Sequence, residues 1–185
     1  MDDWRGYKEI KEATTTPIAM GESLFGLEEG FQPFIENRAV DIIHPETLTA
    51  GAIRETKRIS EYASMFKIPT AIHYAGSPVG CMASVHMIAT IRDFIAMENH
   101  AVDIPWWDDL VTGIPKPVIQ NGYIPVPNSP GLGVELNEEV CKQHLRVPGY
   151  FEPTPQFDKY ILVDYNPGGE YPHLDENGKM VNSRD

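Results

Sequence analysis

The sequence predicts an α/β fold built on a parallel sheet, and three observations support this. Short apolar runs occupy residues 17–21, 40–45 and 68–72, and a helix-like segment follows each of them. Each run stops at an ionisable residue, in turn Glu22, Glu46 and His73. These residues recur at intervals of 24 and 27 positions (22 to 46 and 46 to 73). Regular repetition of strand, polar tip and helix is typical of (β/α) barrels, which present catalytic groups at the C-terminal rim of the sheet.

Chain length limits how much of a barrel can form. The chain has 185 residues, of which 42% are hydrophobic, and this is sufficient for one globular domain with a sizeable core. A closed (β/α)8 barrel, however, needs roughly 250 residues. We therefore expect an incomplete barrel.

Charge and cysteine content exclude several function classes. The net charge is -12, from 15 basic and 27 acidic residues, which argues against a nucleic-acid partner or an anionic membrane. The negative charge does not exclude a small anionic substrate, because a bound metal ion can make the electrostatic potential at the binding site positive. Cys81 and Cys141 form neither a disulfide framework nor a metal-binding pattern. The sequence shows no signal peptide and no apolar run of about 18 residues, so we expect a cytoplasmic protein without a membrane partner.

The first half of the predicted sheet contains two strand–helix units. Residues 3–12 are interpreted as the end of a helix, which a Thr-Thr-Thr-Pro segment terminates before the first strand. A helix-like segment over 27–37 is interrupted by Gly30 and Pro33. The second strand then begins at Val40. An amphipathic helix over 52–67, with Ile53, Thr56, Ile59, Ala63 and Phe66 on its apolar face, completes the second unit.

Two further units follow, and together the four predict a parallel sheet. A third strand over 69–74 precedes a helix over 79–94, and a short fourth strand over 95–97 ends at Glu98. Consecutive strand–helix units with short connections favour parallel strands joined by right-handed crossovers. Beyond residue 100 the chain is less regular, with a turn at Asn121-Gly122 between two short extended runs and a helix over 138–145. From residue 147 onward little periodicity remains.

Glu46 and His73 form the most suggestive pair of polar residues. At the ends of adjacent parallel strands, a carboxylate can accept the imidazole N–H and fix its tautomer. The second ring nitrogen then becomes available as a general acid or base. From spacing alone two alternatives stay open: His73 as a hydrogen-bonded core histidine, and Glu46 as a surface acid. Glu22 is equally compatible with a metal ligand or with an acid near a helix N-terminus.

Several segments carry a family resemblance. They are residues 20–23 (MGES), 41–51 (DIIHPETLTAG), 68–73 (IPTAIH), Glu98, 121–127 (NGYIPVP) and 130–135 (PGLGVE). Over about residues 3–146, these segments closely resemble the C-terminal half of enolase-superfamily barrels. The similarity is to the mandelate racemase/muconate lactonizing enzyme family, in its acid-sugar (galactonate-type) dehydratase branch. The resemblance implies an α/β fold, with residues 1–118 as strands 5–8 of a (β/α)7β TIM-type barrel and 119–185 as a C-terminal extension packing on the barrel or cap.

The resemblance also implies a role for each polar strand end. Glu22 would be a carboxylate ligand of Mg²⁺, His73 and Glu46 would form the acid/base dyad, and Glu98 would hydrogen-bond the substrate carboxylate or its enediolate. The implied substrate is a sugar acid (an aldonate), from which the proton α to the carboxylate is removed. In dehydratases a β-hydroxide then leaves. His100, two residues beyond Glu98, is interpreted as a surface-loop residue, with a place at the mouth of the barrel as the alternative.

Three departures from the family pattern limit these expectations. Glu46 stands where the family commonly has Asp, and the extra methylene could misorient His73. Ala52 replaces the second glycine of the family's AGG, and it would crowd the turn if the backbone there has positive φ. The chain has no counterpart of the KxK lysines, of two further metal carboxylates or of the N-terminal capping domain. The Mg²⁺ site in this chain is therefore expected to be incomplete.

Three functional hypotheses remain. The first is that the chain is the C-terminal part of a dehydratase, or of a mandelate-racemase-like epimerase, and is inactive alone. In the second it is a subunit that a separately encoded N-terminal half completes, and in the third it is a non-catalytic remnant. An open half-barrel leaves unpaired strand edges and an uncovered apolar face. We therefore expect either a partner that supplies the missing half or self-association.

Overall fold

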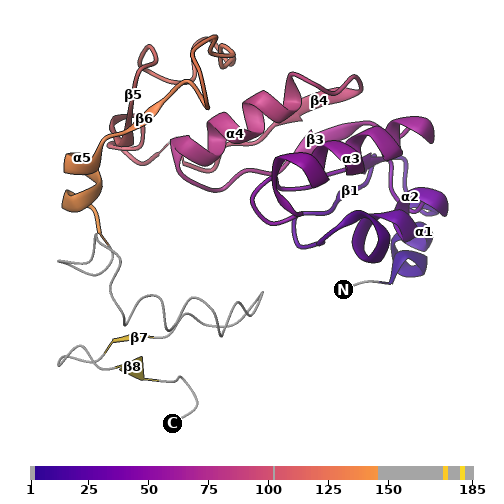
Figure 1. The fold of residues 1–185 in the computed structure, drawn as a ribbon. Helices are drawn as coiled ribbons and strands as arrows, with labels where there is room; N and C mark the ends of the chain where they lie inside the picture. The colour runs from indigo at the N-terminus through magenta and orange to yellow at the C-terminus, as the bar shows by residue number, and fades with distance from the viewer. Residues whose placement is uncertain (1–2, 102, 146–172, 175–179, 182–185) are drawn as a thin grey trace. The chain divides into compact units, whose positions relative to one another are not determined.

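Four short parallel strands form the sheet that organises the chain (Figure 1). In spatial and sequence order they are β1 (Ala19–Met20), β2 (Ile42–Ile43), β3 (Thr70–Ile72) and β4 (Phe94–Met97). Neighbouring strands pair in parallel, for example Met20 with Ile43 and Ile43 with Thr70. This confirms the predicted α/β fold with a parallel sheet. The computed structural model describes residues 3–101, 103–145, 173–174 and 180–181.

Helices connect the strands in the predicted order. They are α1 (Trp4–Glu12), the π-helical turn η1 (Leu27–Phe31), α2 (Gln32–Glu36), α3 (Ala52–Met65) and α4 (Pro78–Ile88). Helix α3 packs against α4, against β3 and against η1. None of the helices in the described part of the chain is long and apolar enough to cross a bilayer.

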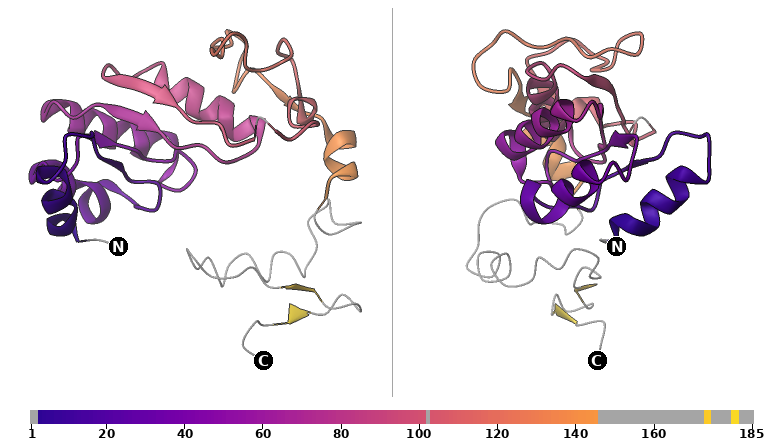
Figure 2. Two further views of the ribbon diagram at one scale, coloured as in Figure 1. Left: turned by 180° about the vertical axis from the view of Figure 1, so that it is seen from behind. Right: turned by 90° about the vertical axis from the view of Figure 1, so that its right-hand side faces the viewer.

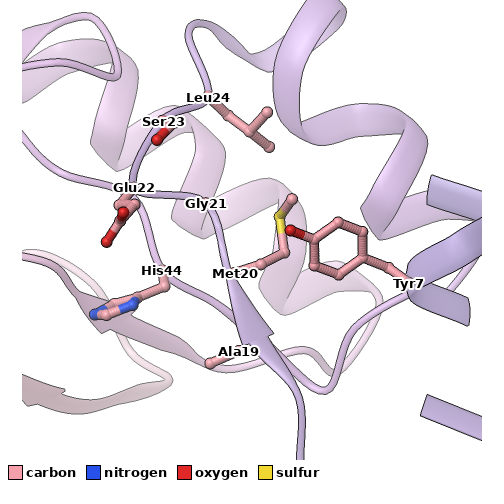
Figure 3. Close-up of a pocket in the computed structure, with 8 residues that line it drawn as sticks. All are labelled: Tyr7, Ala19, Met20, Gly21, Glu22, Ser23, Leu24 and His44. Atoms are coloured by element: carbon pink, nitrogen blue, oxygen red, sulfur yellow. The ribbon is translucent and has the colours of Figure 1, made fainter. Parts of the chain in front are cut away.

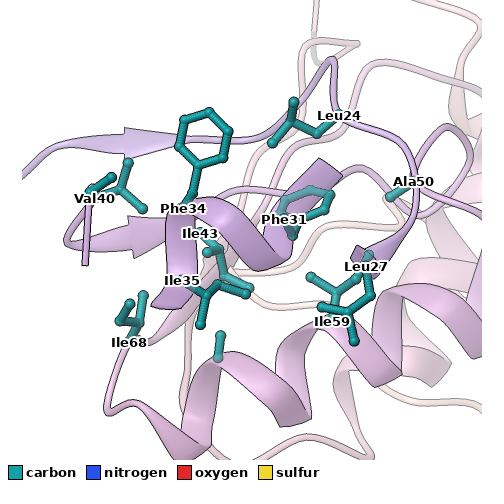
Figure 4. Packing of buried hydrophobic residues seen from close by; sticks show 12 residues of the cluster. Leu24, Leu27, Phe31, Phe34, Ile35, Val40, Ile43, Ala50, Ile59 and Ile68 are labelled. Carbon is teal, nitrogen blue, oxygen red and sulfur yellow. The ribbon is translucent and has the colours of Figure 1, made fainter. Parts of the chain in front are cut away.

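The main hydrophobic core lies between η1, α2, the sheet and α3 (Figure 4). Phe31 and Ile35 enter it from η1 and α2, Ile43 from β2 and Ile59 from α3, and all four are fully buried. Ile53, expected on the buried face of α3, is instead 41% exposed. It lies on the first turn of the helix, before α3 reaches the core.

A second core involves α4 and the segment that follows β4. It contains Tyr74, Cys81, Met82, Trp107 and Val118. The Trp107 indole donates a hydrogen bond to the Gly76 carbonyl at 2.7 Å, which ties this segment to the loop before α4. In Figures 1 and 2, α1 and this later segment lie at opposite ends of the sheet.

Beyond β4 the elements are η2 (Asp108–Leu110), β5 (Val111–Thr112), β6 (Glu135–Leu136) and α5 (Glu138–Gln143). The expected turn at Asn121-Gly122 forms, because Gln120 and Tyr123 exchange backbone hydrogen bonds at 2.8 and 2.9 Å. The two extended runs expected around it do not form strands. Antiparallel pairing occurs instead between β5 and β6, which the sequence did not predict.

Several helix boundaries differ from the prediction, and α3 ends at Met65 rather than at residue 67. The segment over 27–37 divides into η1 and α2. Within η1 a Cβ atom at Gly30 would lie 2.6 Å from the Phe25 carbonyl oxygen, so this turn leaves no room for a side chain there. Helix α4 ends at Ile88 rather than at residue 94. By Asp93 the backbone already accepts a hydrogen bond from Thr70 of β3, so this residue belongs to the sheet ladder. Helix α5 ends at Gln143 rather than at residue 145.

The chain separates into two compact units, residues 1–146 and 147–185. In the second, the structure describes one antiparallel pair, β7 (His173–Leu174) with β8 (Met180–Val181). The rest of the tail, for which the sequence predicts little periodicity, lies outside the described residues. The boundary predicted after residue 118 divides the half-barrel from its C-terminal extension. It is not the same as the division after residue 146, and it stays a prediction.

Candidate active site

The four predicted site residues lie at the C-terminal ends of the four parallel strands. Glu22 follows β1 by two residues and Glu46 follows β2 by three, while His73 and Glu98 come directly after β3 and β4. Because parallel strands present their carboxyl ends at one edge of the sheet, these side chains meet there. The strand order β1-β2-β3-β4 places His73 between the strands that carry Glu46 and Glu98.

Glu46 and His73 are in direct contact. Their backbones form a parallel bridge, and the His73 N–H donates to the Pro45 carbonyl at 3.1 Å. The Nδ1 atom of His73 lies 2.7 Å from Oε2 of Glu46. Both side chains are largely buried, with 15% and 9% exposed. The glutamate side chain, although longer than aspartate by one methylene, therefore reaches the imidazole. The misorientation of His73 that this methylene could cause is not observed.

The other ring nitrogen of His73 faces two carboxylates. Its Nε2 atom lies 3.3 Å from Oε2 of Glu22 and 3.8 Å from Oε2 of Glu98. With Nδ1 occupied by Glu46, Nε2 is the atom that can exchange a proton with a ligand at the strand ends. The three predicted carboxylates thus converge on the imidazole of the fourth predicted residue, His73.

Two more histidines belong to this constellation, and sequence reasoning gave them less weight. Nε2 of His44 and Nε2 of His100 each lie 3.4 Å from Oε2 of Glu98. His100 is 60% exposed, yet it lies at the strand ends, in agreement with the alternative considered for it. Their spacing from the predicted residues could have indicated them, because His44 precedes Glu46 by two residues and His100 follows Glu98 by two. Residues two apart on an extended chain share a face.

A cavity of about 310 Å³ adjoins this group on the β1 side. Residues of α1, β1 and the loops after β1 and β2 line it: Tyr7, Ala19, Met20, Gly21, Glu22, Ser23, Leu24 and His44 (Figure 3). In Figure 3 the side chains of Glu22 and His44 lie on one side of the Gly21 backbone, and those of Met20 and Tyr7 lie on the other. The cavity thus has a polar and an apolar wall.

Gly21 is required for the position of Glu22. Its φ is +143°, and a Cβ atom there would lie 2.6 Å from a ring carbon of Phe31. Only glycine combines this backbone angle with such close packing. The Gly-Glu pair therefore turns the chain after β1 while the Phe31 ring fills the space beneath it.

Comparison with known proteins agrees with this geometry. A family model described as "Enolase C-terminal domain-like" matches residues 1–140. The chain belongs to the enolase superfamily. Among solved structures, a mandelate racemase/muconate lactonizing enzyme-like protein from Rubrobacter xylanophilus superposes with a TM-score of 0.76 and 36% identity. That similarity covers 80% of this chain and 37% of the Rubrobacter chain.

Curated relatives in this superfamily are sugar-acid dehydratases. A D-xylonate dehydratase from Haloferax volcanii is 40% identical over 138 residues, covering 75% of this chain and 33% of that protein. A D-gluconate dehydratase from Thermoproteus tenax is 29% identical over 147 residues, covering 80% of this chain and 29% of that protein. The chain therefore spans about a third of the length of these enolase-superfamily relatives.

Proposed function

We propose that residues 1–140 are the C-terminal part of a Mg²⁺-dependent acid-sugar dehydratase. In this proposal β1 to β4 correspond to strands 5–8 of a (β/α)7β barrel. The names of the Haloferax and Thermoproteus relatives support an aldonate substrate. The observation that carries the proposal is the position of His73, whose Nδ1 contacts Glu46 at 2.7 Å while Nε2 faces Glu22 and Glu98.

The proposed reaction begins with proton transfer to His73. Its Nε2 atom accepts the proton α to the substrate carboxylate, and Glu46 stabilises the resulting imidazolium through Nδ1–H. Glu98 acts here as a carboxylic acid whose O–H donates a hydrogen bond to a carboxylate oxygen of the substrate as the enediolate forms. The β-hydroxide then takes a proton from a general acid and leaves as water. The enol that results tautomerises to a 2-oxo-3-deoxy acid.

Glu22 fits the role of one Mg²⁺ ligand. It offers a hard carboxylate oxygen at a strand end, and 61% of its side chain is exposed to an incoming ion. When bound, Mg²⁺ supplies positive charge that stabilises the negative charge developing on the substrate oxygens. Mg²⁺ usually takes several oxygen ligands, and one protein carboxylate holds it weakly. We therefore expect residues 1–185 to be inactive alone and to need a further polypeptide segment or a second chain.

An epimerase is the alternative within the same superfamily, and the Rubrobacter structure, with its mandelate racemase-like title, favours it. The same base would then remove the α proton, and a second acid would return a proton to the opposite face of that carbon without loss of hydroxide. A non-catalytic half-barrel subunit is the remaining alternative. The outer strand β4 favours a partner surface, since Ile95 is 52% exposed on it.

A chimeric enzyme tests the proposal in a complete barrel. Residues 1–140 would replace the matching segment of the Haloferax D-xylonate dehydratase, and formation of the 2-oxo-3-deoxy acid from D-xylonate would be measured with Mg²⁺. We expect turnover that His73→Ala lowers by about 10²- to 10⁴-fold, as for loss of a general base. His86→Gln is the matched control, because the His86 ring contacts the Leu132 carbonyl away from the site. A folded chimera without dehydration, or a fully active His73→Ala variant, would contradict the proposal.

The isolated chain provides a separate test of its expected inactivity. Purified residues 1–185 would be incubated with D-xylonate, D-gluconate or D-galactonate and Mg²⁺. We expect no product. Dehydration that His73→Ala abolishes would show that the chain is competent alone.

A further inference from the structure

Three imidazoles surround one carboxylate oxygen at the strand ends. Nε2 of His44 and of His100 each lie 3.4 Å from Oε2 of Glu98, and Nε2 of His73 lies 3.8 Å from it. We propose that His73, Glu98 and His100 bind a nitrogen-preferring divalent cation, with Zn²⁺ as the type case. This goes beyond the proposed dehydratase function, which uses Mg²⁺ at Glu22 and assigns His100 no role.

The spacing of the three ligand atoms fits a tetrahedral ion. Zn²⁺ binds histidine nitrogen at about 2.0–2.1 Å, so two ligand atoms of a regular tetrahedron lie about 3.3 Å apart. The measured separations from Glu98 are 3.4 and 3.8 Å, and the ligand atoms of all three residues lie within 4.8 Å of one another. Rotation of the exposed His100 and Glu98 side chains would close the remaining gap. Three protein ligands leave the fourth position open to water.

Hydrogen bonds around the cluster orient its ligands. Metal-binding histidines almost always donate their second ring nitrogen to a carboxylate or carbonyl, which fixes the tautomer and raises ligand basicity. His73 has this arrangement, because its Nδ1 lies 2.7 Å from Glu46. His44 contacts the same Glu98 oxygen from another side and can donate to it. Two of the proposed ligands, His73 and Glu98, thus already have hydrogen-bonding partners in the absence of an ion.

The chemistry of the donor set selects the class of ion. Imidazole suits Zn²⁺, Ni²⁺ and Cu²⁺, while carboxylate and water suit Mg²⁺. Glu22 approaches Nε2 of His73 at 3.3 Å and keeps its own oxygens available for a harder ion. An ion on Nε2 would occupy the lone pair that the proposed reaction needs. In a complete enzyme, Zn²⁺ would therefore inhibit even when Mg²⁺ is present.

Metal titration of the untagged 1–185 chain tests this site without any activity measurement. Co²⁺ serves as a spectroscopic probe, because four-coordinate Co²⁺ absorbs visible light strongly, and Zn²⁺ binding is measured by calorimetry. We expect one site that millimolar Mg²⁺ does not displace. Loss of a supporting carboxylate lowers metal affinity roughly 10- to 100-fold, so Glu46→Gln should weaken binding by that factor and His100→Ala at least as much.

His144→Ala is the matched control, because the His144 ring stacks on Trp106 at 4.0 Å and contacts none of the proposed ligands. It should bind Zn²⁺ like the wild type. The His100 side chain is largely exposed, so His100→Ala should keep the fold, and far-UV circular dichroism checks this. Equal Zn²⁺ affinity in wild type and folded His100→Ala would overturn the proposal, as would displacement of Co²⁺ by Mg²⁺. Neither result would affect the dehydratase proposal, which depends on His73 as the base and is tested by aldonate turnover.

Discussion

Replacing Ala52 by glycine should stabilise the chain. Ala52 is the first residue of α3, and its φ is +65°, in the left-handed region that L-residues avoid. The positive φ that is the condition for strain at this position is therefore present. The side chain is exposed, so its methyl group contributes little packing that glycine would lose.

The magnitude follows from two opposing effects. The left-handed conformation costs an L-residue about 1–2 kcal/mol, and glycine removes this cost. Glycine also gives the unfolded chain more freedom, which offsets about 0.4–1 kcal/mol. The net stabilisation is then about 0.5–1 kcal/mol. For a unit of this size, it corresponds to a rise in Tm of about 1–4 °C.

Thermal and urea unfolding followed by circular dichroism would measure the effect. Ala89→Gly is the matched control, because Ala89 is also exposed at a helix end but has φ of -60°. There glycine relieves no strain and should destabilise by about 0.5–1 kcal/mol. Opposite signs for the two variants are the expected result. Equal destabilisation by both would refute the strained conformation at Ala52.

Three further predictions follow from individual contacts. The Ile18 N–H donates to Asp41 and lowers the pKa of that carboxyl, so its stabilisation is present above about pH 4 and lost as pH falls through the lowered pKa. Asp41→Ala should therefore cost about 1 kcal/mol at pH 7 and progressively less as the pH falls below about 4 in urea unfolding, and a pH-independent cost would contradict this. Burial raises the pKa of the fully buried Cys81 thiol to about 12, so iodoacetamide at pH 8 should modify the partly exposed Cys141 first, as mass spectrometry would show. Gly21→Ala should destabilise by about 2 kcal/mol or more, and an unchanged urea midpoint would argue against the close packing beneath Gly21.

The strands were predictable because their signal is local. Each apolar run is short, lies between helical segments and ends at a polar residue, so the positions of β1 to β4 follow from pattern alone. Strands β5 and β6 were not predictable. Neither lies in an apolar run that precedes a helix-like segment, and their pairing joins Val111 with Leu136 across a long irregular segment. Such pairing depends on tertiary packing that a local pattern does not encode.

The site was predictable to the extent that one polar residue ends each strand. Glu22, Glu46, His73 and Glu98 fulfil this rule, and the structure brings them together. His100 does not follow this rule, because it lies three residues beyond the end of β4, where the chain is still extended. The backbone N–H groups of Glu98 and His100 donate to the carbonyls of Ile72 and Tyr74, so pairing with the neighbouring strand continues. Sequence alone does not show where such pairing ends.

The tautomer of His73 tests the central claim most directly. The claim is that Glu46 holds Nδ1–H and leaves Nε2 available as the base, and ¹⁵N NMR of the neutral ring distinguishes the two nitrogens. We predict the Nδ1–H tautomer in the wild type and a shift of this equilibrium in Glu46→Leu, which removes the acceptor. A neutral His73 protonated on Nε2, or a tautomer that Glu46→Leu leaves unchanged, would contradict the account.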